Sequence, residues 1–62
     1  MTGWNAERVR ALRKRLGLSQ AEMARRLGVR QGTVSEWETG LYEPRSTRLR
    51  MLELLEQGEV PP

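Results

Sequence analysis

The fold of this chain is decided by residues 18–40, LSQAEMARRLGVRQGTVSEWETG. Ser19 stands three residues before Glu22, the spacing of a capping box, in which each side chain bonds the backbone N–H of the other residue. Apolar residues then recur at helical spacing, and Gly28 is the residue type that ends a helix in the left-handed conformation. These signals predict a short helix over about residues 19–27.

A second short helix is predicted over about residues 30–39, after a tight turn. Val34 and Trp37 share one face at about 100° per residue, and Gly40 ends the helix. The opposite face carries small, hydroxyl and amide side chains, which suit close approach to the base edges of DNA. Gly32 leaves room for a duplex to approach this face closely. The alternative is that Gly32 is only a first-turn residue, where a glycine lowers the stability of the helix little. The pair is therefore interpreted as a helix-turn-helix that reads DNA.

The charge of the chain is distributed unevenly. The 62 residues carry a net charge of +3 and the sequence pI is near 10.6. Residues 1–30 hold eight basic and two acidic side chains, whereas residues 31–62 hold three basic and six acidic ones. We expect a polyanion to prefer the surface built from the first two helices and the start of the third. The alternative is that the basic side chains of this surface only lie on helix faces that are exposed to water.

Composition excludes several classes of protein. The chain has no cysteine and no histidine, so we expect no disulfide, no metal site and no cofactor. The apolar runs are too short to span a bilayer, and no secretory segment follows Met1. We therefore expect a cytoplasmic protein of one domain, residues 1–62. The carboxylates are scattered rather than convergent, and a small helical bundle leaves little room for a catalytic cleft, so we expect no enzyme.

A further helix is predicted before the pair, over about residues 5–16. Asn5 is a favourable N-cap, and Trp4 and Val9 have the spacing of a hydrophobic staple. An inward stripe follows at spacings of three and four residues, namely Val9, Leu12 and Leu16. The basic residues expected to point away from this stripe are Arg8, Arg10, Lys14 and Arg15.

One basic residue of this helix does not point away. Arg13 flanks the inward stripe by helical geometry, and Glu38 flanks the buried face of the second helix of the pair in the same manner. We therefore predict a structural ion pair between Arg13 and Glu38 at the edge of the core. Removing one partner of such a pair is costly, because the other charge stays half-buried.

A fourth helix is predicted over about residues 46–57, after the loop set by Gly40 and Pro44. Ser46 is its expected N-cap. Its core-facing stripe is Leu49, Leu52 and Leu55. Two further apolar residues, Met51 and Leu54, lie to the side. They either widen the core face or form a dimer contact together with Leu41 and Tyr42.

The chain from residue 12 to residue 40 resembles the lambda-repressor-like, or XRE-type, helix-turn-helix family. The residues that carry the resemblance are R-x-x-x-G-L-S-Q-x-x-x-A-x-x-L-G-V-x-x-x-T-V-S-x-W-E-x-G, starting at Arg13, and the later Pro44 and leucines also fit. The resemblance implies an all-α fold, a compact bundle of four, or five, short helices. It also supports the Arg13–Glu38 pair, since a buried Arg–Glu pair recurs at these positions in the family.

The resemblance assigns roles by position. Residues at the start of the recognition helix meet bases in the family, and the corresponding positions here are Arg30, Gln31, Gly32 and Glu36. The expected DNA phosphate contacts are Ser19, Gln20, Thr33, Ser35, Thr39 and Arg45. This chain departs from the family in that its recognition helix carries no Arg or Lys after Arg30.

The function that the resemblance implies is sequence-specific binding of double-stranded DNA by a small transcriptional regulator. Members of the family usually bind palindromic sites as homodimers, so a homodimer is the expected partner. The alternative is an antitoxin-like interaction module, which binds a toxin partner and regulates its own operon. The acidic second half of the chain would serve that role.

Overall fold

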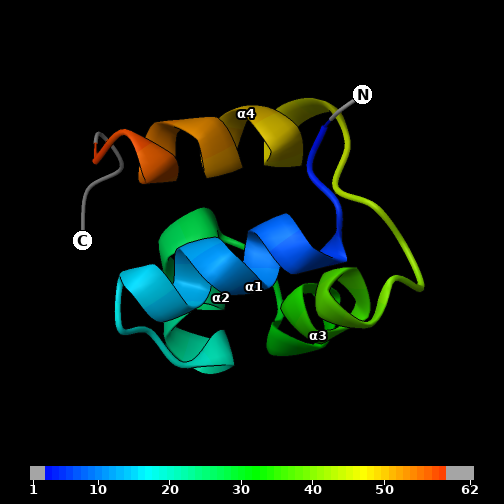
Figure 1. The fold of residues 1–62 in the computed structure, drawn as a ribbon, viewed down its shortest axis with the longest axis horizontal. Coiled ribbons are helices and arrows are strands. Elements are labelled where there is room, and N and C mark those ends of the chain that lie inside the picture. Colours follow the sequence, from blue (N-terminus) through cyan, green and yellow to red (C-terminus); the bar gives the residue numbers. More distant parts are fainter. Residues whose placement is uncertain (1–2, 59–62) are drawn as a thin grey trace.

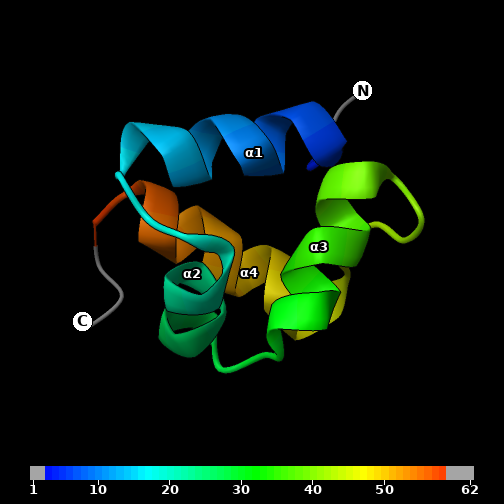
Figure 2. The same cartoon turned by 90° about the horizontal axis from the view of Figure 1, so that it is seen from below.

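The computed structural model describes residues 3–58, and within this range it contains helices and no strands. The helices are α1 (Ala6–Arg15), α2 (Gln20–Leu27), α3 (Gln31–Thr39) and α4 (Ser46–Glu56). As Figures 1 and 2 show, α2 and α3 form a bent pair, α1 lies across them, and α4 lies along another side. The all-α prediction is confirmed. Each helix boundary lies within one residue of the predicted one.

The helix ends follow the local sequence signals. The side chain of Asn5 accepts a bond of 2.8 Å from the backbone N–H of Arg8. The capping box is complete, because Ser19 Oγ accepts from the N–H of Glu22 at 3.0 Å and Glu22 Oε1 accepts from the N–H of Ser19 at 2.8 Å. Gly28 ends α2 at φ 72° and Gly40 ends α3 at φ 82°. Only glycine adopts this conformation at little cost, so both helices stop where the sequence predicted.

The start of α4 differs from the prediction. Ser46 is not the N-cap; the cap residue is Arg45, whose backbone is extended and whose side chain makes no capping bond. The carbonyl of Arg45 accepts the first backbone bond of the helix, from the N–H of Arg48 at 3.0 Å. Ser46 therefore becomes the first helical residue, at a φ of 50°, which costs an L-residue about 1 kcal/mol.

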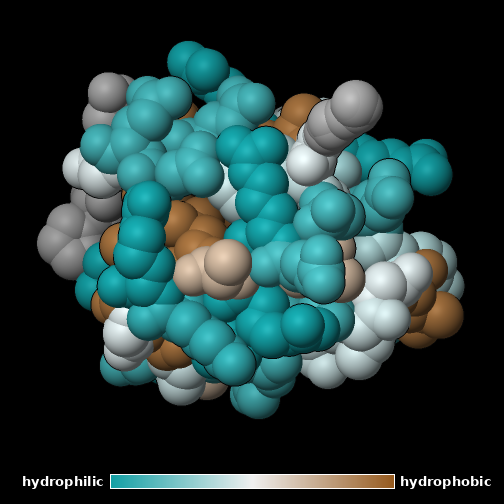
Figure 3. Space-filling model, viewed as in Figure 1, coloured by the Kyte–Doolittle hydropathy of each residue, from teal (hydrophilic) through white to brown (hydrophobic). Residues whose placement is uncertain are grey.

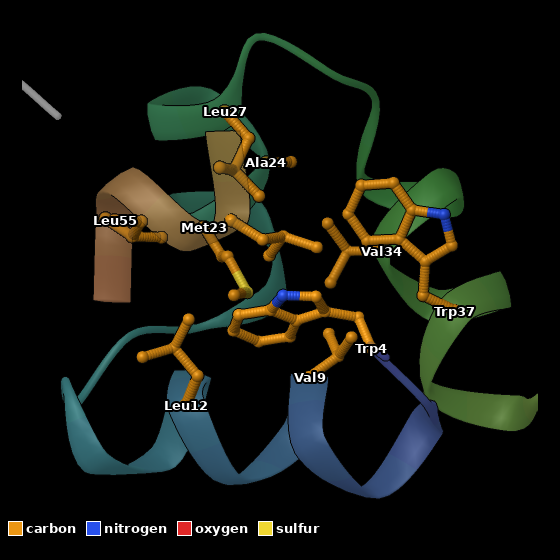
Figure 4. Close-up of a cluster of buried hydrophobic side chains, with 10 residues drawn as sticks. Trp4, Val9, Leu12, Met23, Ala24, Leu27, Val34, Trp37 and Leu55 are labelled. Carbon is orange, nitrogen blue, oxygen red and sulfur yellow. The ribbon is translucent and has the colours of Figure 1, made fainter. Parts of the chain in front are cut away.

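The core lies where the helices face one another. Its buried side chains come from every helix and from the segment before α1 (Figure 4), namely Trp4, Val9, Leu12, Met23, Ala24, Leu27, Val34, Trp37, Leu52 and Leu55. Two side chains depart from the prediction. Leu16 is 37% exposed, because α1 ends at Arg15 and the chain turns away before Leu16 can face inward. Met51 packs against the core, as the first of the two alternatives for it predicts.

Trp4 does more than staple α1. It is 4% exposed and lies at the centre of the cluster, beside Val9 and Met23 (Figure 4). Its Nε1 is buried and has no hydrogen-bond partner within residues 3–58, which costs about 1–3 kcal/mol. Burying about 150–250 Å² of indole contributes about 4–6 kcal/mol at about 25 cal/mol per Å². The apolar contribution is the larger one, so Trp4 stabilises the bundle.

Each helix packs against at least one of the others. Both α1 and α2 pack against α3, and α4 packs against α2. Two arginines of α1 also reach the end of α4: Arg8 Nη2 lies 3.1 Å from Glu56 Oε1, and Arg15 Nη2 donates to the carbonyl of Glu56 at 3.2 Å. Because α1 and α2 pack against the inner side of α3, its outer face is left uncovered by the other helices (Figure 2). Within the described part of the chain, no helix is long and apolar enough to cross a membrane.

Candidate nucleic-acid interface

The inner face of α3 is anchored in the bundle. Val34 is fully buried, Trp37 is 4% exposed and Glu38 is 5% exposed. The helix begins at Gln31, so its first turn presents two exposed residues, Gln31 and Gly32. The anchored residues fix the rotation of the helix about its axis, and this rotation turns the first turn toward solvent.

The remaining polar residues of α3 are not equally available. Thr33, Ser35 and Glu36 are half-buried, whereas Thr39 is exposed. The hydroxyl of Thr39 donates to the carbonyl of Glu36 at 3.1 Å, so it is already engaged by its own helix. A Cβ added to Gly32 would meet nothing within 4 Å. Packing within the chain therefore does not require a glycine there, and the glycine leaves open space on the exposed side of α3.

A buried carboxylate joins the ends of three helices. Arg13 Nε lies 2.6 Å from Glu38 Oε2, and Arg13 Nη2 donates to Glu38 Oε1 at 2.9 Å. Gln20 Nε2 donates to the same Oε1 at 3.2 Å, and Arg10 Nη2 donates to the backbone carbonyl of Glu38. The predicted ion pair is present, and Arg10 does not point away as predicted, because the end of α3 offers it this carbonyl. These four residues are the Glu38 network.

The Glu38 network keeps the carboxylate charged. Burial raises the pKa of Glu38, but the hydrogen bonds from Arg13 and Gln20 and the charges of Arg13 and Arg10 outweigh burial, and the net pKa lies below its usual value. The hydrogen bond to Glu38 also raises the pKa of Arg13. The Arg13–Glu38 pair is therefore held in its charged form.

Apart from Arg50, which lies 3.7 Å from Glu53 within α4, the arginines divide into two groups. Those of α1 are mostly engaged within the molecule: Arg8 and Arg15 bind Glu56, and Arg10 and Arg13 bind Glu38. Over residues 3–58, no carboxylate lies within 4.0 Å of a second group, which comprises Arg25, Arg26, Arg30, Arg45 and Arg48. Most of the predicted anion-attracting charge of α1 thus has internal partners, and the available charge lies at the end of α2 and at the starts of α3 and α4.

A shallow hollow of about 660 Å³ lies between α3 and the start of α4. Thr33 and Trp37 line one side, and the loop and first turn of α4 line the other, including Arg45, Thr47 and Arg48. Sequence reasoning missed Thr47 and Arg48. A signal was available for Arg48, because a cation in the first turn of a helix opposes the helix dipole and α4 has no acidic residue there. Arg45 and Arg48 thus both lie at the edge of this hollow.

The loop between α3 and α4 exposes apolar surface. Leu41 is 64% exposed and Tyr42 is 61% exposed, and both border the hollow. In Figure 3 the projecting loop carries brown atoms at the right-hand edge of a mostly hydrophilic face. Leu54 is half-buried. Of the four predicted dimer contacts, Leu41 and Tyr42 are thus the most accessible.

Comparison with known proteins adds two findings. A family model described as helix-turn-helix (HTH_3) matches residues 9–55. A protein of Archaeoglobus fulgidus named "Putative HTH-type transcriptional regulatory protein" is 41% identical over 51 residues, which are 82% of this chain and 16% of that protein. The chain thus spans about a sixth of the length of this relative. No solved structure matches the chain.

Proposed function

This chain belongs to the XRE-type helix-turn-helix family, and from that premise we propose that it binds double-stranded DNA in a sequence-specific manner as a transcriptional regulator, with α3 in the major groove. The observation that carries the proposal is the division of α3 into two faces. Val34, Trp37 and Glu38 are buried, while the first turn is exposed and polar. A helix held in this way can enter the major groove without losing its packing.

The base contacts are assigned to the exposed start of α3. Gln31 has the geometry to bond adenine with both atoms of its amide, and Glu36, one turn on, can accept from the amino group of cytosine. Gly32 lets the helix approach the bases closely, and Arg30 reaches guanine or a phosphate. Arg30, Gln31 and Gly32 are exposed at the N-terminal end of α3, and Glu36 is half-buried farther along the helix.

The phosphate contacts flank this helix on two sides. Ser19 and Gln20 lie at the start of α2, where free backbone N–H groups also favour an anion. Arg45 and Arg48 lie at the start of α4, across the hollow from Thr33. The other two phosphate contacts proposed are Ser35 and Thr39, and the hydroxyl of Thr39 would exchange its bond to the carbonyl of Glu36 for one to the phosphate. Hydrogen-bond donors thus flank the reading helix on two sides, and this arrangement suits contacts with the phosphates of both strands of one duplex.

Selection from a pool of random duplexes, followed by sequencing of the retained DNA, tests this proposal. We expect enrichment of one short sequence. A palindrome with half-sites about one helical turn apart would establish a dimer on DNA, and a single half-site would keep DNA reading but remove the dimer. Retention of all sequences alike, or of none at low salt, would overturn the proposal.

A homodimer formed through Leu41 and Tyr42 is the second part of the proposal, and the exposure of these two residues supports it. Sedimentation velocity with and without duplex measures it. We expect a dimer on DNA that Leu41→Ser with Tyr42→Ser converts to a monomer of unchanged helical content. If the double variant dimerises as the wild type does, this surface is not the interface. A wild type that stays monomeric on DNA would overturn the homodimer. Leu41 and Tyr42 would then be candidates for contact with a different protein, as in the antitoxin alternative.

A further inference from the structure

We propose that Glu38, a residue that does not reach DNA, positions the side-chain amide of Gln20 so that it donates to a DNA phosphate. This inference rests on the proposed function, because it explains how one of the assigned phosphate contacts is oriented. The observation behind it is the bond of 3.2 Å from Gln20 Nε2 to Glu38 Oε1.

The placement of the two residues suits this role. Glu38 lies in the last turn of α3 and is 5% exposed. Gln20 is the first residue of α2 and is half-buried, so its amide bonds Glu38 while part of the residue stays in contact with solvent. The bond thus joins a rigid buried group to a side chain at the protein surface.

The chemistry of the bond allows one orientation of the amide. An ionised carboxylate only accepts hydrogen bonds, so Gln20 must turn its NH₂ group and not its oxygen toward Glu38. This NH₂ group has two N–H donors, and Glu38 takes one of them. The second remains for an anion. If Glu38 were absent, the amide could rotate by half a turn and present its oxygen, which a phosphate repels.

Arg13 makes the arrangement compatible with DNA. A carboxylate beside a phosphate would repel it, but Arg13 binds both oxygens of Glu38, at 2.6 and 2.9 Å, and neutralises this charge. Arg13 Nη1 also donates to the carbonyl of Leu18 at 3.1 Å, so the same guanidinium holds the turn that leads into Gln20. Arg13 and Glu38 are therefore positioning residues for the contact that Gln20 makes.

A double-mutant cycle tests the proposal. One arm replaces the ion pair by apolar residues, Arg13→Met with Glu38→Leu, which keeps net charge and often keeps stability. The other arm is Gln20→Met, and the third protein carries all three changes. The probe is a fluorescent pool of mixed-sequence duplexes about 20 base pairs long at about 50 mM salt, and the melting temperature of each variant is recorded.

We expect Gln20→Met to weaken binding about tenfold, the value of a hydrogen bond to a charged group. The apolar pair should weaken binding by a similar factor, and the triple variant should bind no more weakly than Gln20→Met alone. The salt dependence of binding should not change, because no charge paired with phosphate is lost. Additive losses, or no loss in either arm, would overturn the proposal.

A matched control removes a different Arg–Glu pair. Arg8→Met with Glu56→Leu deletes the pair at 3.1 Å between α1 and α4, which does not touch Gln20. Its affinity for the same duplexes should stay within about twofold of the wild type. An equal loss in this control would mean that the ion pairs act through general stability, and would also overturn the proposal.

A measurement on the wild type covers the case in which the apolar pair fails to fold. In a spectrum that resolves side-chain amides, both Nε2 proton signals of Gln20 should move when duplex is added. Signals that stay still while backbone signals of α3 move would overturn this inference alone. A wild type that binds no duplex at low salt would instead overturn the proposed function, and this inference with it.

Discussion

The guanidinium carbon of Arg8 lies 3.8 Å from the centroid of the Trp4 ring. The same guanidinium pairs with Glu56 at 3.1 Å, so one side chain covers the buried tryptophan and also joins the start of α1 to the end of α4. The segment before α1 is thus part of the core through Trp4, and Arg8 links its covered ring to the end of α4.

Trp4→Ala should destabilise the protein strongly. Removing a buried aromatic side chain costs about 3–5 kcal/mol, which is a large part of the stability of a domain of this size. Thermal unfolding followed by circular dichroism measures the effect. Arg8→Met is the control, because it removes a half-exposed partner of Trp4 and should cost about 1 kcal/mol or less. Similar losses in the two variants would contradict the central place of Trp4 in the core.

Arg13→Ala should destabilise the protein more than the double variant Arg13→Met with Glu38→Leu, which removes both members of the ion pair. The single variant leaves the carboxylate of Glu38 buried without its cation, which costs about 3–5 kcal/mol. Arg13→Met with Glu38→Leu leaves no buried charge and should cost much less. Urea unfolding of both variants measures the difference. An unchanged midpoint for Arg13→Ala would show that the pair does not contribute to stability.

Stability should fall in acid. The pKa of Glu38 and the pKa of Glu22 lie below their usual values in the folded protein, the latter mainly through its hydrogen bonds with Ser19. The unfolded chain therefore binds protons more tightly. The contribution of both groups is fully present above the unfolded-state pKa of about 4.3 and is lost as the pH falls through the lowered folded-state values.

Melting temperatures measured from about pH 7 down to about pH 3 test this expectation. The variant Arg13→Met with Glu38→Leu lacks one of the two carboxyls and should lose less of its melting temperature over the same interval. If wild type and variant lose it equally, Glu38 does not contribute to the acid sensitivity.

Variants of the proposed interface should separate into two kinds. Gln31→Ala and Glu36→Ala should change which sequence is selected, because they remove contacts to base edges. Arg45→Ala and Arg48→Ala should weaken all sequences alike and lower the salt slope by about 0.9 each, because each removes one phosphate-paired charge. Binding to a panel of duplexes at several salt concentrations distinguishes them. If Gln31→Ala weakens every sequence equally, α3 is not the reading helix.

The sequence by itself determined the helices and their ends. The capping box of Ser19 and Glu22, the cap at Asn5 and the glycines at residues 28 and 40 all act between neighbours in the chain. Such bonds form in the same way wherever the helix is placed. Helical geometry also put Arg13 and Glu38 on facing edges, and their pair is present.

Tertiary structure decided which partners the side chains meet. Arg10 finds a carbonyl on α3, Gln20 finds Glu38, and Arg48 borders a hollow beside Thr33. The loss of Leu16 from the core and the cap of α4 at Arg45 rather than Ser46 likewise follow from how the chain turns between helices. Sequence spacing describes one helix at a time, whereas these contacts depend on how helices distant in the sequence pack together.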